Sequence, residues 1–293
     1  MTRRILTLGT VAAATLAAAV ATPAAAVTDG DFDGNGHPNV GMIVFYAPDG
    51  AGDVHRYRCS ATLVSETVLL TAAHCTDGTV GDTIVSFDPV IAEEPPSGLP
   101  EADPATGYVG DQVDEQGRTW EAGTAHTAPG YSDFTDLKNW NDYGVVVLDD
   151  PITDIEPATV APTGYLDTFK QPALNKTIFT TVGYGTEVRK AESGPQKPTP
   201  MSYPIIRRVA QEPGQKLTPQ ILQVNGNGKD NRGTGGTCFG DSGGPTFKDG
   251  YLVAVTSYGY TSNCRYLDGL QRVDIDEAAA FLADFGVEPA TLG

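Results

Sequence analysis

Short apolar stretches recur along the chain from residue 27 onward, and Gly, Pro, Asn and Asp separate them. The clearest stretches occupy residues 41–46, 61–70, 144–148, 177–182 and 251–258. With 34 Gly and 21 Pro in 293 residues, this punctuation is typical of an all-β protein built from many short strands.

The last part of the chain follows a helical pattern instead. Residues 275–285 carry Ala, Leu and Phe at helical spacing, with Asp276 and Glu277 near the start and Gly286 as a stop. We expect a C-terminal α-helix that packs on the β body.

A polar connection divides the rest of the chain into halves of similar size. We predict an N-terminal domain over residues 27–150, an interdomain connection over residues 151–164 and a C-terminal domain over residues 165–293.

The N-terminus has the parts of a secretory signal peptide. Two arginines precede an apolar run over residues 5–20, and small residues at 24–26 offer an A-x-A cleavage signal before Val27. A membrane anchor is the alternative, but the run is rich in Ala and Thr and ends at Pro23. We therefore predict a signal peptide over residues 1–26 and a secreted, extracellular protein.

Composition and charge narrow the functional classes. The chain is 40% hydrophobic, which supports a folded core. Its formal charge is -18, because 37 Asp and Glu oppose 19 Lys and Arg. Such a surface repels nucleic acid and anionic lipid, so we expect neither nucleic acid nor a membrane as a partner. We also expect a monomer in solution.

Four cysteines in an exported chain suggest two disulfides, and three connectivities are possible. Their spacing favours the two local pairs, Cys59 with Cys75 and Cys238 with Cys264. A zinc site is the alternative, but the chain has no C-x-x-C and its histidines are scattered, so we expect no metal.

Acidic residues raise the question of calcium at two places. Residues 93–117 are rich in Asp and Glu and have no Lys or Arg, which predicts a solvated loop and leaves calcium binding as the alternative. Residues 29–34 (DGDFDG) match the first half of an EF-hand loop, but Val40 stands where the loop needs its bidentate Glu, so we reject that match.

The string CFGDSGGP over residues 238–245 carries the strongest chemical signal. A nucleophilic serine needs a sharp turn that exposes its hydroxyl, and neighbouring glycines let backbone N–H groups face an oxyanion. Ser242 has Gly240, Gly243 and Gly244 beside it. The string also fits the G-x-S-x-G elbow of α/β-hydrolases, but those enzymes need a histidine after the serine, and all four histidines precede Ser242.

A general base and its carboxylate partner can also be chosen from the sequence. His74 stands beside Cys75, which a disulfide would hold rigid. Asp142 leads into an apolar strand between His74 and Ser242 in the chain, where a buried carboxylate would fix the imidazole tautomer. The other histidines have no such fixing device and are expected to be structural: His37, His55 and His126.

The motifs TAAHC (71–75), DYGVVVL (142–148) and CFGDSGGP (238–245), in that order, resemble the trypsin/chymotrypsin-like serine peptidase family. The resemblance covers nearly all of residues 27–285. It implies two six-stranded antiparallel β-barrels packed face to face, with the site in the cleft between them and a C-terminal helix. It further implies a secreted, bacterial serine endopeptidase that acts on protein or peptide substrates and meets proteinaceous inhibitors.

The resemblance also assigns roles to single residues. His74 would be the general base and acid, Asp142 the orienting carboxylate and Ser242 the nucleophile. The backbone N–H groups of Gly240 and Ser242 would form the oxyanion hole. The family's disulfides would be the same two local pairs.

In the family, a new N-terminal amine activates the enzyme by pairing with the Asp before the serine, here Asp241. Val27 resembles that N-terminal residue, so cleavage after Ala26 would deliver an active enzyme.

The resemblance places the floor of the substrate pocket at Gly236 and its walls at Ser257, Gly259 and Gly269. Glycine in place of an acidic floor favours an apolar P1 side chain over a basic one, unless Asp268 supplies a negative charge.

Two other functions stay open. A catalytically silent homologue would use the fold as a binding module, and an esterase would use the same triad on another substrate. Nothing indicates an organic cofactor, since the chain has neither G-x-G-x-x-G after a strand nor a phosphate-binding loop.

Overall fold

The structure is a computed structural model that describes residues 27, 30–92, 98–188, 201–228 and 234–291. The predicted signal peptide over residues 1–26 lies outside the described residues. Within the described part of the chain, no helix is long and apolar enough to cross a membrane.

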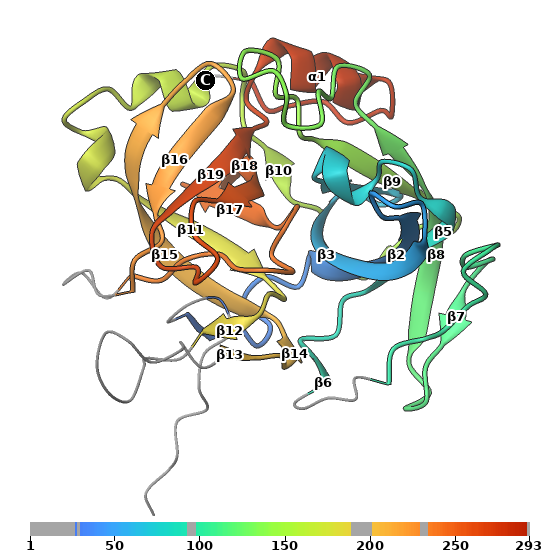
Figure 1. The fold of residues 1–293 in the computed structure, drawn as a ribbon. Coiled ribbons are helices and arrows are strands. Elements are labelled where there is room, and N and C mark those ends of the chain that lie inside the picture. Colours follow the sequence, from blue (N-terminus) through green and yellow to red (C-terminus); the bar gives the residue numbers. More distant parts are fainter. Residues whose placement is uncertain (1–26, 28–29, 93–97, 189–200, 229–233, 292–293) are drawn as a thin grey trace, which may run out of the picture.

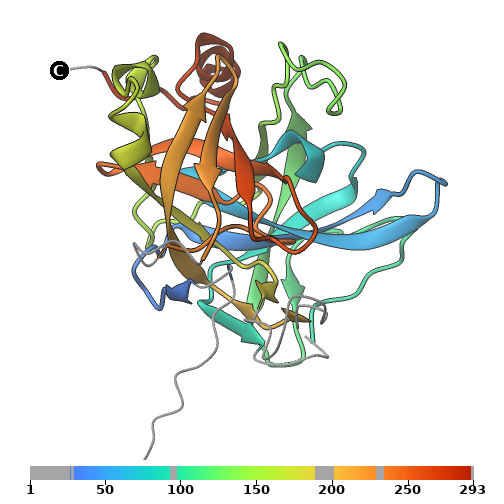
Figure 2. The same cartoon turned by 60° about the vertical axis from the view of Figure 1, so that its left-hand side comes forward.

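Six antiparallel strands close into a first barrel, drawn mostly in blue and green in Figure 1. The strands are β2 (Val40–Pro48), β3 (Val54–Ser65), β4 (Val68–Thr71), β5 (Val80–Ser86), β8 (Thr119–Thr127) and β9 (Gly144–Leu148). Their order is β5-β2-β3-β4-β9-β8, and pairing of β5 with β8 closes the ring. Figure 2 shows the arms of the β2–β3 hairpin extending beyond the barrel.

A second closed barrel uses six strands from the later part of the chain. They are β11 (Ile178–Gly183), β15 (Arg208–Leu217), β16 (Ile221–Asn225), β17 (Pro245–Lys248), β18 (Tyr251–Gly259) and β19 (Leu267–Arg272). Their order is β15-β11-β17-β18-β19-β16, and β15 pairs with β16 to close the ring. The predicted fold class of two six-stranded antiparallel barrels is confirmed.

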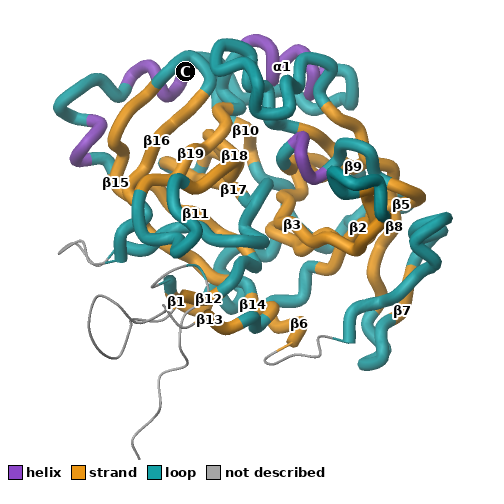
Figure 3. Tube along the Cα trace, in the orientation of Figure 1, coloured by secondary structure: helices purple, strands orange, loops and turns teal. Residues whose placement is uncertain are grey.

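Several shorter helices and strands lie around the two barrels. Helical structure is confined to a few short segments in Figure 3. The 3-10 turns are η1 (Ala73–Cys75), η2 (Tyr165–Thr168) and η3 (Leu174–Lys176). The remaining strands are β1 (Asp31–Phe32), β6 (Val90–Ala92), β7 (Gln112–Val113), β10 (Thr159–Val160), β12 (Glu187–Val188), β13 (Met201–Ser202) and β14 (Ile205–Ile206). β1 pairs with β15 of the second barrel, and β10, which lies in the predicted interdomain connection, pairs in parallel with β18.

Four of the five apolar stretches correspond to one strand each. The stretch over residues 61–70 instead contains the end of β3, a turn at residues 66–67 and most of β4. Hydropathy alone did not reveal this turn because the residues on both sides of it are buried.

The predicted C-terminal helix is α1 (Asp276–Ala283). Its inner face buries Ala278, Phe281 and Leu282, and Gly286 follows it with a φ of +75°, a conformation that suits glycine at a helix end. These side chains belong to an apolar cluster shared with β4, β9 and β18. The helix therefore stabilises the packing of the two barrels as well as its own position.

Candidate active site

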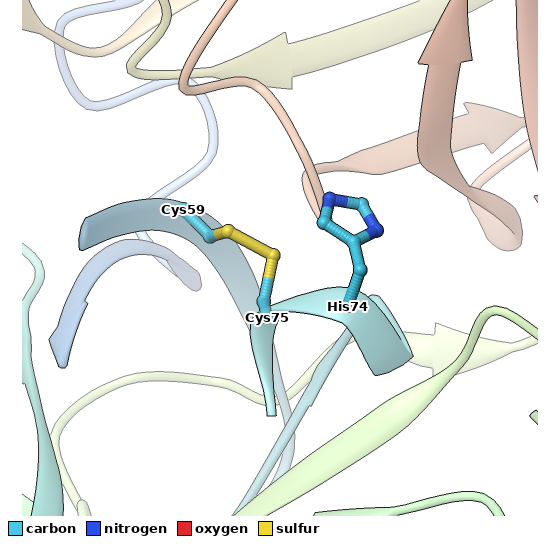
Figure 4. A group of neighbouring side chains, drawn as sticks. All are labelled: Cys59, His74 and Cys75. Carbon is cyan, nitrogen blue, oxygen red and sulfur yellow. A yellow bond between two sulfur atoms is a disulfide. The ribbon is translucent and has the colours of Figure 1, made fainter. Parts of the chain in front are cut away.

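His74 lies on η1, the single turn that follows β4, and its position is fixed by a disulfide. Cys59 of β3 is bonded to Cys75, which confirms the predicted pair. Figure 4 shows the disulfide and the imidazole rising from the same turn. The possible ligand atoms of these three residues lie within 4.8 Å of one another, but two sulfurs bonded to each other offer no thiolate to a metal.

His74 is paired with a buried carboxylate. Its Nδ1 lies 2.9 Å from Oδ2 and 3.1 Å from Oδ1 of Asp142, and its backbone N–H donates to Oδ1 at 2.9 Å. Asp142 is fully buried, whereas the His74 side chain is 22% exposed. With Nδ1 held by the carboxylate, Nε2 is the ring nitrogen left for a reacting proton.

The second barrel holds Asp142 from the other side. Ser257 on β18 donates its hydroxyl to Asp142 Oδ2 at 2.6 Å, and Trp140 Nε1 donates to Ser257 Oγ at 2.9 Å. The backbone N–H of Asp142 donates to Gln271 Oε1 on β19 at 3.0 Å. Ser257 was predicted only as a pocket wall, and Trp140 and Gln271 were not predicted at all, because nothing in their local sequence shows contacts across the barrels.

Ser242 lies in a loop that is clamped between the two barrels. Its carbonyl accepts the backbone N–H of Ser60 on β3 at 2.8 Å, and the N–H of Gly243 donates to Thr256 O on β18 at 2.8 Å. A Cβ on Gly243 would lie 2.0 Å from Thr71 Oγ1 at the end of β4, so only glycine allows this approach. Thr71 precedes His74 by three residues, so the loop packs against the strand end from which His74 emerges. Ser242 itself is half-buried.

Two backbone donors beside Ser242 have no acceptor among the described residues, namely the N–H groups of Gly240 and Ser242. Gly240 has a φ of +97°, and its carbonyl accepts the hydroxyl of Ser60 at 3.0 Å, which fixes the peptide. Such preset donors can stabilise a developing oxyanion. The described part of the chain shows no hydrogen bond between the Ser242 hydroxyl and His74.

Asp241, the predicted partner of the Val27 amine, is completely buried behind this loop. Its oxygens accept the backbone N–H groups of Gly185 and Cys238, both at 2.8 Å. Burial raises the pKa of Asp241 to about 7, although these two bonds and the positive charge of Arg58 oppose the rise. Val27 is also fully buried, and its carbonyl accepts a backbone hydrogen bond within its own turn.

A cavity of about 360 Å³ opens beside Ser242. Ser257, Gly259 and the aromatic rings of Phe239, Tyr258 and Tyr260 contribute to its lining, and the second predicted disulfide, Cys238–Cys264, is confirmed at its edge.

Two of the predicted pocket residues do not line this cavity. A Cβ on Gly236 would meet the backbone of Gly226 at 2.4 Å, and one on Gly269 would meet the ring of Tyr258 at 2.2 Å. Gly236 and Gly269 therefore serve close packing behind the wall. Asp268 is also behind it, 2% exposed, where its Oδ2 accepts the N–H of Thr237 at 2.9 Å.

The other three histidines have partners elsewhere. His37 bonds to Asp33 and stacks on Phe247, and His126 packs against Phe285. His55 lies 3.4 Å from the carboxylate of Asp49. In the acidic insertion, Asp114 bonds to Arg118 and Trp120, so its carboxylate serves the local fold.

Comparison with known proteins agrees with this geometry. Residues 40–276 match the family model described as Trypsin. Over 224 residues the chain is 28% identical to brachyurin of Leptuca pugilator, covering 74% of this chain and 83% of brachyurin. Over 129 residues it is 30% identical to kallikrein-8 of Homo sapiens, covering 39% and 46% of the two chains. A solved structure of HL collagenase superposes with a TM-score of 0.59 at 16% identity, covering 88% of this chain and 97% of that one, which shows likeness of fold.

Proposed function

The chain belongs to the trypsin family of serine endopeptidases, and on that premise we propose that it hydrolyses peptide bonds through an acyl-enzyme formed on Ser242. The observation that carries the proposal is the buried Asp142 carboxylate bonded to His74, beside a serine loop with two backbone donors that no acceptor of the described residues occupies. Protein or peptide substrates follow from the family.

The proposed reaction begins at the Ser242 hydroxyl. The oxygen attacks the substrate carbonyl carbon while Nε2 of His74 takes the hydroxyl proton, and the same nitrogen then gives this proton to the leaving amine. Asp142 keeps the Nδ1 proton in place and stabilises the imidazolium that forms. The bond between Ser242 and His74 would form on substrate binding, since catalytic hydrogen bonds are often loose without substrate.

The tetrahedral intermediate carries its negative charge on the former carbonyl oxygen. The N–H groups of Gly240 and Ser242 would hold this oxygen, and losing one such donor typically costs about 2.7–4 kcal/mol of barrier stabilisation. Water then attacks the acyl-enzyme with His74 as the base, which frees Ser242.

The cavity beside Ser242 would take the P1 side chain. Its aromatic lining favours large apolar or aromatic groups, in keeping with the glycine that the sequence has in place of an acidic pocket floor. Gly259 keeps this part of the wall thin, because a Cβ placed there would only reach van der Waals contact with Asp268 Oδ1 at 3.5 Å.

Activation is proposed to need a free amine at Val27. A carboxyl buried as deeply as Asp241 is more stable with a positive charge beside it, and an ammonium group would supply one. Release of residues 1–26 as a signal peptide would generate that amine, so the proposal includes secretion and an extracellular location. A bacterial source is a further part of the proposal. We also propose that the protein is a monomer, that proteinaceous inhibitors can block it, and that it has neither a membrane nor a nucleic acid as a partner.

A peptide mixture analysed by mass spectrometry tests the function. The protein beginning at Val27 should cleave internal bonds, and the Ser242→Ala variant should lose on the order of 10⁶ in kcat. Loss of cleavage only in the variant supports a serine endopeptidase, and the cleaved sites report the P1 preference. Folded, disulfide-bonded protein that cleaves esters alone, or nothing, would count against the proposal and favour an esterase or a silent homologue.

A further inference from the structure

A second cavity, of about 430 Å³, adjoins the serine loop at Phe239 and Gly240. Phe239 also lines the P1 cavity, which takes the rest of its lining from the serine loop, β18 and the loop after it, whereas the second cavity is walled mainly by β2 and β3 of the first barrel. We call it the β3 cavity. Its described lining carries Arg56 and Arg58 but no Asp or Glu, although the whole chain has a formal charge of -18. The β3 cavity is therefore a locally cationic place on an acidic protein.

Arg58 carries a charge that no neighbouring carboxylate pairs with. Its Nη1 donates to the carbonyl oxygen of Tyr184 at 2.7 Å, and among the described residues it has no ion-pair partner. Burial lowers the pKa of this half-buried side chain, and the charge of Asp241 opposes that fall from a longer range. A partly desolvated cation of this kind is stabilised by an anion that enters beside it.

Arg56 adds a second positive charge to the same wall. Its Nη1 donates to the carbonyl oxygens of Leu99 at 3.2 Å and Pro100 at 2.8 Å, which hold the side chain in place. The nearest printed carboxylate is Glu101, 3.8 Å away and 84% exposed. An exposed pair at that distance contributes little, so much of the charge of Arg56 still acts on the cavity.

The guanidinium of Arg58 lies against the residue that is proposed to bind the oxyanion. A Cβ on Gly240 would lie 3.2 Å from Cζ and 3.4 Å from Nη2 of Arg58. The guanidinium therefore packs on the Cα of Gly240, within a few atoms of the bond that the proposed reaction breaks.

The position of the P1 cavity indicates which part of a substrate meets Arg58. With the P1 side chain on the second barrel, the segment after the scissile bond leads away from it, past Gly240 and toward β3. On this edge of β3 the N–H of Ser60 donates to the carbonyl oxygen of Ser242. Alternate residues of a strand present their backbone groups to the same edge, so Arg58 faces it too. Over residues 54–58, β3 pairs only with β2 among the described strands, and an extended peptide can add to such an edge.

Building on the proposed peptidase function, we propose that the β3 cavity selects substrates that carry a carboxylate within the three residues after the scissile bond, P1′ to P3′, and that Arg58 binds this carboxylate. The guanidinium would donate charge-assisted hydrogen bonds to the carboxylate oxygens. Because Arg58 stays protonated and a substrate carboxylate stays ionised near neutral pH, the preference is constant there, and it weakens at high ionic strength.

The test compares C-terminally amidated peptides that share one apolar P1 residue and have either Glu or Gln at P1′, P2′ or P3′ in turn. At low salt, the ratio of kcat/KM for Glu over Gln should reach about tenfold at one of these positions and should fall when salt is added. A carboxylate can also come from a chain end. A Gln peptide that ends at the selected position is therefore measured as the free acid and as the amide, and a preference for the acid alone would show that the cavity binds the chain end.

Three variants test the role of Arg58. Arg58→Gln keeps a donor for Tyr184 but removes the charge, so the Glu/Gln ratio should fall to about one to two, whereas Arg58→Lys should keep a ratio above about three. Lys216→Gln removes an exposed charge on β15 that is not in this lining, and its ratio should match the wild type. Each ratio is taken within one enzyme, so an effect of Arg58 on Asp241 or on the serine loop cancels.

Two results would overturn the proposal. One is a wild-type ratio near one at all three positions with no preference for the free acid, which needs no variant that folds. The other is a ratio that Arg58→Gln leaves unchanged.

A binding measurement separates this inference from the proposed function. The Ser242→Ala protein has no nucleophile, but calorimetry should show that it binds the Glu peptide more tightly than the Gln peptide. Such a difference without cleavage by the wild type refutes only the peptidase function, whereas cleavage of both peptides at equal rates refutes only the role of Arg58.

Discussion

Replacing Ser257 by alanine tests whether the second barrel holds Asp142 in place. The substitution removes the hydroxyl that donates to Asp142 Oδ2 at 2.6 Å, inside a site from which water is largely excluded. A hydrogen bond to a charged acceptor contributes about 1.5–3 kcal/mol. The buried indole N–H of Trp140, now 2.9 Å from Ser257 Oγ, would also lose its acceptor, which costs about 1–3 kcal/mol.

The two effects together predict a loss of about 2.5–6 kcal/mol in the free energy of unfolding. In a protein of this size, that corresponds to a fall in Tm of roughly 5–24 °C. Urea and thermal unfolding should be followed in a Ser242→Ala background, which prevents self-digestion. Ser262→Ala is the matched control, because Ser262 is an exposed serine of the same cavity wall and its loss should change stability by less than about 0.5 kcal/mol.

A double-mutant cycle separates the two contributions. Trp140→Phe keeps an aromatic ring but removes the N–H, so Ser257→Ala leaves no unpaired donor in that background. The cost of Ser257→Ala should then fall by about 1–3 kcal/mol. A cost below about 1 kcal/mol in the wild-type background, or an equal cost in both backgrounds, would refute the reasoning that these bonds stabilise the buried carboxylate.

Three further predictions concern the serine loop. Gly243→Ala should cost more than about 3 kcal/mol of stability, because its Cβ would overlap the hydroxyl of Thr71 at a φ of +74°. Gly250→Ala is the control, since Gly250 has a φ of +84° but lies in open space, and it should cost only about 1 kcal/mol when urea unfolding of the two variants is compared. Replacing Cys238 and Cys264 by serine should cost about 3–4 kcal/mol, since the bridge spans 26 residues, and the same assay would contradict this if stability were unchanged. Burial raises the pKa of Asp241 from 3.8 to about 7, so a folded chain with an N-terminal extension holds a proton there that the unfolded chain has lost. The free energy of unfolding of that chain should therefore fall on the order of 2–4 kcal/mol as the pH rises from about 4 to about 7. The free energy of unfolding of a chain with the free activating amine should fall less, and urea midpoints of the two chains compare them.

The sequence predicted the parts of the site that short segments encode. Glycines around Ser242 predict a tight loop because few other residues adopt the required backbone, and the structure has positive φ at Gly240 and Gly243. The two disulfides were predicted because each joins cysteines that are near in sequence. The barrels were predicted from apolar stretches bounded by turn residues, and the β3–β4 hairpin was missed where both strands are buried.

Contacts between distant segments could not be predicted in this way. Trp140, Ser257 and Gln271 meet around Asp142 only after the barrels pack, and each has an ordinary local sequence. Gly236 and Gly269, the two glycines predicted to line the pocket, also show that contacts between distant segments cannot be predicted from local sequence. Whether a glycine opens a cavity or admits a neighbouring group depends on that neighbour, and at Gly269 the neighbour is the ring of Tyr258.

The burial of Glu212 is the clearest example of a property that depends on the fold and not on the local sequence. It lies in RVAQEPGQKL, where an acidic residue among polar neighbours suggests a solvated position. Burial follows because β11 and β16 pair with the two edges of β15, which turns the face with Ala210, Glu212 and Gly214 into the barrel. Such burial of a carboxyl group opposes folding unless another group stabilises it. The hydrogen bond from the Thr181 hydroxyl to Glu212 Oε2 offsets part of that cost, and burial raises the pKa of the Glu212 carboxyl well above its usual value.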